Sequence, residues 1–195
     1  MIENPDAEIP ESPAVVAVAP NAFAAGDVEE ILRERGWLVR GVGGANGEDA
    51  PQVAAWFAQA ASLLGTHAAD RAGLAELLSL IFQFDAAATL ATRDAQAVMM
   101  RTGSRDVIRE LAKLVLDGAA IDSGRFKEII ETLKTKVRLR SRELFHPIRL
   151  ALAGRAGEGE LDRVILLLDS AAALEFVVRV KGTRERMLEF CAALD

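Results

Sequence analysis

The chain has 195 residues, of which 51% are hydrophobic and 27% charged, and its net charge is −6. This length and apolar content suffice for a hydrophobic core, which excludes an intrinsically disordered chain. The longest apolar runs, such as residues 14–19, are far too short to span a membrane, which takes roughly 20 residues.

Residues 1–22 are predicted to be an acidic, proline-rich tail exposed to solvent. Four of the six prolines of the chain lie here among aspartate and glutamate residues. The segment has neither the basic and apolar regions of a signal peptide nor the arginines of a transit peptide. We therefore expect a cytoplasmic protein without membrane contact.

Residues 23–103 are predicted to form an N-terminal helical subdomain. Asp27 and Glu30 have the spacing of a capping box, which would begin a helix in the segment DVEEILRERGWL. Two alanine- and leucine-rich helices are expected over 52–64 and 70–82, the first of them directly after a proline.

Residues 104–195 are predicted to form a C-terminal helical subdomain. The segment 104–118 carries an apolar stripe at helical spacing, with Ser104 as its cap and Gly118 as its end. The segment 123–137 repeats this stripe.

Evidence for strands is thin throughout the chain. Tyrosine is absent and runs of β-branched residues are short, so even the segment FVVRV at 176–180 is interpreted as helix. The expected fold is all-α, a helical bundle or cage of two small subdomains with about eight to ten helices.

No residue pattern in the chain indicates catalysis, a cofactor or a metal. The glycine stretch 41–47 lacks the third glycine of a dinucleotide-binding fingerprint, so we expect a loop. His67 is expected in an interhelical turn and His146 at a helix entry, and neither has catalytic or metal-ligand spacing. The one cysteine, Cys191, excludes an intramolecular disulfide and is expected to be buried.

Positive charge is concentrated in residues 125–155. This segment carries nine basic and three acidic residues, a net +6, so the rest of the chain carries −12. Such polarity is typical of a protein that binds a polyanion in one place, although a solvated basic helix face would produce it too.

The segment FHPIRLALAG is predicted to hold a helix of about two turns that begins at Pro147 and ends at Gly154. Ile148 and Leu152 share its packing face. Arg149 would lie in the first turn, where the helix dipole disfavours a cation. It therefore needs either a carboxylate partner or an anionic ligand, and the residues alone leave both open.

Three short motifs follow one another in the segment from Phe126 to Leu168. PIRLALAG at 147–154 follows P-[LI]-R-x-A-L-[TS]-G at every position except 153, Glu158–Leu161 takes the place of a G-P-x-L loop, and Leu167–Asp169 that of an L-L-G segment. In these features the segment resembles the C-terminal anticodon-binding region of bacterial glutamyl-tRNA synthetases.

The resemblance implies an α-helical cage that receives the anticodon loop of a tRNA. It places Arg149 outward against a base, and the loop Glu158–Leu161 as the source of polar contacts and an apolar platform. A side chain laid on an unpaired base contributes about 1–3 kcal/mol. The expected RNA-binding residues are Arg149, Arg138, Arg140, Arg142, Lys136, Arg155, Glu158 and Leu161.

The sequence also departs from the family pattern. Ala153 replaces a hydroxyl residue, Glu158 adds negative charge to the loop, Gly159 stands in place of proline, and Asp169 in place of glycine. The H-I-G-H-like and K-M-S-K-S-like motifs of the catalytic domain are missing, so we expect no activation of glutamate and no ATP binding by this chain alone.

Three functions remain open. The chain is either a non-catalytic tRNA-binding module, or a degenerate synthetase paralogue that serves as a protein-interaction scaffold, or a piece that completes a separate glutamyl-tRNA synthetase catalytic core in trans. A buried ion pair between Arg149 and one of the chain's own acids would favour the scaffold.

Overall fold

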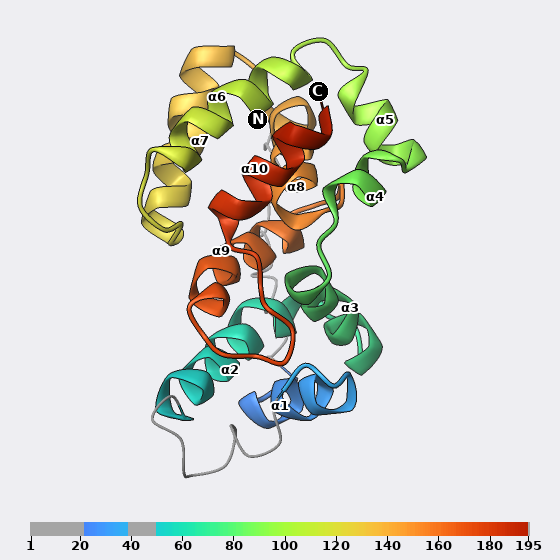
Figure 1. Ribbon diagram of the computed structural model, residues 1–195, viewed down its shortest axis with the longest axis vertical. Helices are drawn as coiled ribbons and strands as arrows, with labels where there is room; N and C mark the ends of the chain where they lie inside the picture. The colour runs from blue at the N-terminus through green and yellow to red at the C-terminus, as the bar shows by residue number, and fades with distance from the viewer. Residues whose placement is uncertain (1–21, 39–49, 195) are drawn as a thin grey trace, which may run out of the picture.

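The computed structural model describes residues 22–38 and 50–194. Within these ranges the chain forms ten α-helices and one short 3-10 helix, with no strand, which confirms the all-α prediction. The predicted tail and the glycine stretch 41–47 lie outside the described residues, apart from Ala22. Figure 1 shows helices α1–α3 at one end of the molecule, α6 and α7 at the other, and α8–α10 between them.

The first end of the molecule consists of α1 (Ala25–Glu34), α2 (Ala50–Leu64), the 3-10 helix η1 (Gly65–His67) and α3 (Arg71–Phe82). The capping box of α1 lies three residues earlier than predicted. Ala24 is the N-cap, and the Asp27 carboxylate accepts a hydrogen bond from its backbone N–H at 2.7 Å. His67 lies in the turn between α2 and α3, as the sequence predicts.

Four helices form the other end and one side: α4 (Ala86–Leu90), α5 (Arg93–Met99), α6 (Ser104–Leu116) and α7 (Ser123–Val137). Helices α6 and α7 match the predicted segments to within two residues at each end, since their apolar stripes face the core. The N-cap of α6 is Gly103, in the left-handed region at φ 87°, rather than Ser104.

Helix α8 (Ser141–Ala153) begins six residues before the proline that was predicted to start it. Pro147 lies inside the helix, so the predicted entry at Pro147 is wrong, and His146 is likewise an interior residue of α8. The cause is a longer apolar stripe, in which Leu144, Ile148 and Leu152 follow one another at a spacing of four residues and are all fully buried. The predicted end is confirmed by Gly154, a left-handed C-cap at φ 78°.

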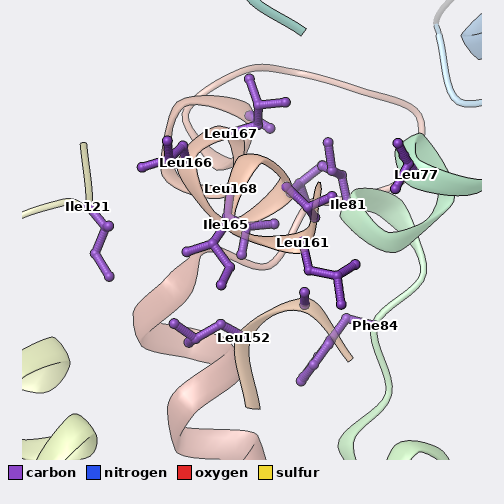
Figure 2. Packing of buried hydrophobic residues seen from close by; sticks show 14 of the residues in the cluster. Leu77, Ile81, Phe84, Ile121, Leu152, Leu161, Ile165, Leu166, Leu167 and Leu168 are labelled. Atoms are coloured by element: carbon purple, nitrogen blue, oxygen red, sulfur yellow. The ribbon is translucent and has the colours of Figure 1, made fainter. Parts of the chain in front are cut away.

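Helix α9 (Glu160–Ala172) is the centre of the core and packs against α2, α3, α8 and α10. Its run of Val164–Leu168 is buried on every side, as expected for a helix that is apolar all round. Figure 2 shows Leu161 and Ile165 of α9 close to Ile81 of α3, to Leu152 of α8 and to Phe84.

The segment between α9 and α10 (Thr183–Leu194) is an irregular loop, so the prediction of a helix over 176–180 is wrong. The loop crosses back to the first end of the molecule, where the Val177 N–H donates to the Trp37 carbonyl at 2.9 Å. There Phe176 packs edge-on against Trp56 and Phe82, with ring centroids 5.4 and 5.0 Å apart. Long-range contacts override the local pattern here.

Two polar residues join segments that are far apart in the sequence. Asp169 of α9 accepts hydrogen bonds from the backbone of Ile121 at 2.6 Å and from Thr183 at 2.7 Å, which ties the start of α10 and the approach to α7 to the central helix. Arg186 of α10 is fully buried. Cys191 is only partly buried, against the edge of the core, rather than buried as predicted.

Candidate nucleic-acid interface

Two adjoining hollows lie between α7, the first turns of α8 and the start of α9. Their volumes are about 860 and 450 Å³, and Glu131, Lys134 and Phe145 line both of them. We refer to the pair as the basic groove. Its charged and aromatic residues are His67, Phe126, Lys127, Glu131, Lys134, Arg138, Arg140, Phe145, Asp162 and Arg163.

The groove carries an excess of positive charge. Five cations line it against two carboxylates, and both carboxylates are already bound: Glu131 to Lys134 at 2.7 Å, and Asp162 to Arg149. The hydrogen bond from Lys134 lowers the pKa of the Glu131 carboxyl. Within the described part of the chain, the remaining four cations form no ion pair, and these are Lys127, Arg138, Arg140 and Arg163.

A tight turn between α7 and α8 brings two of these cations to the mouth of the groove. Arg138 is the C-cap of α7, in the left-handed region at φ 57°, and its N–H donates to the Lys134 carbonyl. Ser141, at φ 48°, adopts the same uncommon conformation. Arg140 lies between them as the N-cap of α8, and both arginines are exposed.

Arg149 is buried, and the expectation that it reaches outward is wrong. Its side chain donates two hydrogen bonds of 2.7 and 2.8 Å to the Asp162 carboxylate and a third of 2.6 Å to the Gly157 carbonyl. Its guanidinium carbon lies 4.9 Å from the centre of the Phe145 ring. Because α8 begins earlier than predicted, Arg149 lies in mid-helix facing α9, and only 7% of it is exposed.

Leu161 is also buried rather than exposed. It lies at 0% exposure in the first turn of α9, so the prediction that it offers an apolar platform is wrong. The loop before it carries Glu158, whose exposed carboxylate pairs with Arg142 at 3.1 Å. Both of these side chains lie outside the lining of the basic groove.

The structure separates the other predicted cations. Lys136 pairs with Glu110 of α6 at 3.2 Å and lines a different hollow, on the other side of α7. Arg155 is exposed in the loop after α8, away from the groove lining. Of the predicted site residues, Arg138 and Arg140 are brought together in the groove.

Most residues of the groove were missed by the sequence analysis as candidate contacts, among them His67, Lys127, Phe145 and Arg163. A signal existed for Lys127, because Lys127, Glu131 and Lys134 are spaced at i, i+4 and i+7 on one face of α7. Nothing in the local sequence points to His67 or Arg163, which reach the groove through the packing of α2 and α9.

His146, next to Phe145, carries no catalytic partner among the described residues. Both of its ring nitrogens are shielded from solvent without a hydrogen-bond partner, and burial together with the nearby charges of Arg101 and Arg149 lowers its pKa. In the described ranges no group of three or more histidine, cysteine and acidic residues is arranged to hold a metal. None of the described helices has the length and apolarity needed to cross a bilayer.

The helical fold and this groove can be compared with known proteins. A family model described as an anticodon binding domain matches residues 28–175. The chain therefore belongs to the anticodon-binding domain family.

A curated relative matches part of the chain. Over 82 residues the chain is 30% identical to "Glutamate--tRNA ligase 2" of Syntrophus aciditrophicus (strain SB), a match that covers 42% of this chain and 17% of the relative. No solved structure matches the chain. The predicted resemblance to the anticodon-binding region of a glutamyl-tRNA synthetase-like protein is confirmed.

Proposed function

We propose that the chain is a non-catalytic tRNA-binding module of the cytoplasm that receives an anticodon loop in the basic groove. The observation that carries the proposal is the set of four cations without an ion pair beside Phe145, in a chain of the anticodon-binding domain family. The proposed RNA contacts keep Arg138 and Arg140 from the predicted set and add Lys127, Arg163 and Phe145.

The composition of the groove suits the loop of an RNA hairpin. Phosphates bind to cations that have no competing carboxylate, and Arg138 and Arg140 at the mouth meet that condition. Unstacked bases bind to aromatic faces, and the partly exposed Phe145 lines both hollows of the groove. The acidic remainder of the chain would repel RNA from the other faces.

The test is fluorescence anisotropy with an anticodon stem-loop RNA over a series of salt concentrations. We expect binding at low salt, with a logarithmic slope of about 0.7 for each phosphate neutralised, and a smaller slope for Arg138→Ala and Arg140→Ala. Arg93→Ala is the matched control, because Arg93 is exposed on α5, outside the groove. No affinity at low salt, or an equal loss with Arg93→Ala, would refute the proposal.

A second function is favoured by the state of Arg149. Its positive charge is neutralised by the ion pair with Asp162, which is the arrangement expected of a scaffold that has lost its anionic ligand. The exposed negative charge of Glu158 also favours a scaffold. If the chain is a protein-interaction scaffold, a partner should co-purify with it after nuclease treatment and at high salt, whereas an RNA-bridged partner should be lost.

A further inference from the structure

We infer that Phe145 is the stacking platform for one unpaired base of the bound RNA, an inference that rests on the proposed function. Phe145 lies in the second turn of α8 and is partly exposed. It lines both hollows of the basic groove, so its ring lies where the two meet. A base that enters from either hollow reaches this ring.

The ring of Phe145 is held in place by the protein before any ligand arrives. Arg149 follows it by one helical turn, and the guanidinium lies 4.9 Å from the ring centre, within the range of a cation–π contact. The guanidinium is itself fixed by three hydrogen bonds to Asp162 and Gly157. An ordered aromatic ring loses little conformational entropy when a base stacks on it.

Charge around the ring favours a nucleotide over an apolar ligand. Arg138 and Arg140 line the hollow on one side of Phe145, Lys127 and Arg163 line the hollow on the other side, and Lys134 lines both. A phosphate on either side of a stacked base therefore meets a cation. This places the buried Arg149 in support of the ring, while the exposed cations contact the backbone of the RNA.

Phe126 is the natural comparison within the same groove. It is also partly buried, but it lines only one of the two hollows and belongs to α7. No guanidinium lies over its ring among the described cation–π contacts. Phe126→Leu therefore serves as a matched control for Phe145→Leu, since each change removes one ring from one groove and keeps an apolar side chain.

The experiment uses the full chain and an RNA stem-loop in which each loop base in turn is replaced by the fluorescent base 2-aminopurine. At one loop position we expect quenching on binding. Phe145→Leu should abolish that quenching and weaken binding by about five- to 150-fold, with an unchanged salt slope, because no charge is removed. Phe145→Trp should restore the quenching, and Phe126→Leu should preserve it.

Equal affinity and equal quenching in Phe145→Leu and the wild type would overturn the inference and leave the proposed function standing. Loss of quenching with Phe126→Leu instead would also overturn it, in favour of the other ring. Absence of any RNA binding by the wild-type chain would refute the proposed function and this inference together. Thermal unfolding of each variant, followed by circular dichroism, shows whether a loss of binding comes from the missing ring or from an unfolded protein.

Discussion

Two buried arginines hold two regions of the molecule together in different ways. Arg149, beside the basic groove, binds a carboxylate, so its charge is neutralised by Asp162. Arg186, at the centre of the molecule, donates to the carbonyls of Lys181, Leu152 and Ile81 at 2.9, 2.7 and 2.6 Å. Burial lowers the pKa of Arg186 to about 9, although the charges of Glu189 and Asp169 raise it.

The difference shows which task each arginine performs. The three carbonyls at Arg186 come from the end of α3, the end of α8 and the loop before α10, so its guanidinium is satisfied only when all three segments are in place. Arg149 instead fastens one neighbouring segment, the loop and first turn of α9, next to the groove. We therefore expect Arg186 to govern global stability and Arg149 to govern the shape of the groove.

The largest effect is expected from Arg186→Met. The change leaves three buried carbonyls without donors, and we expect the free energy of unfolding to fall by about 3–5 kcal/mol. Urea denaturation followed by circular dichroism measures it. Arg184→Met on the exposed face of the same helix is the control, and equal losses in the two variants would contradict the central role of Arg186.

The next largest effect is expected from Asp162→Ala. The change leaves the buried Arg149 without a counter-charge. Because the Asp162 side chain is 21% exposed, water can enter the site and accept some of the hydrogen bonds of Arg149, so we expect the free energy of unfolding to fall by about 2–3 kcal/mol. Arg149→Met combined with Asp162→Leu should be less destabilising than the sum of the single changes. Strict additivity in this double-mutant cycle would show that the pair is not coupled.

A smaller effect is expected at Glu189, whose charge partly compensates Arg186. Burial raises the pKa of this carboxyl, but hydrogen bonds from Lys181 and the Ala86 N–H lower it more, so the pKa in the folded state lies below 4.5. As the pH falls through 4.5, the unfolded state takes up the proton before the folded state does, so the free energy of unfolding falls. Chemical denaturation as a function of pH should show a shallower acid loss for Glu189→Gln, and an unchanged profile would count against this contact.

The smallest effect is expected at His146, close to Arg149. Burial and the charges of Arg101 and Arg149 hold its pKa below 6.5 in the folded state, so stability should decline as pH falls below 6.5. His146→Gln should remove that part of the decline. Thermal melts in a pH series measure it, and an NMR titration that placed the His146 pKa above 6.5 would contradict the prediction.

The helices of the second half show what the sequence could predict. The limits of α6 and α7 follow from apolar stripes and caps within single segments, which is local information. The predicted start of α8 was wrong because Pro147 looked like a first-turn residue. The spacing of Leu144, Ile148 and Leu152 held the signal for a longer helix.

The groove was less predictable, because it depends on how the turn between α8 and α9 closes. Arg149 and Asp162 are 13 residues apart, and nothing in their local sequence distinguishes this pairing from an exposed arginine. The same holds for Arg186, which lies among polar residues in TRERML and is buried because the distant ends of α3 and α8 converge on it together with the loop before α10.

The loop that brings Phe176 and Val177 back to Trp37 has a consequence for synthesis of the chain. The aromatic cluster around Trp56 and Phe82 is complete only when residue 176 is present, more than a hundred positions after the first of its rings. On the ribosome, the apolar surface of the helices made first stays exposed until the segment around residue 176 has been synthesised and has emerged.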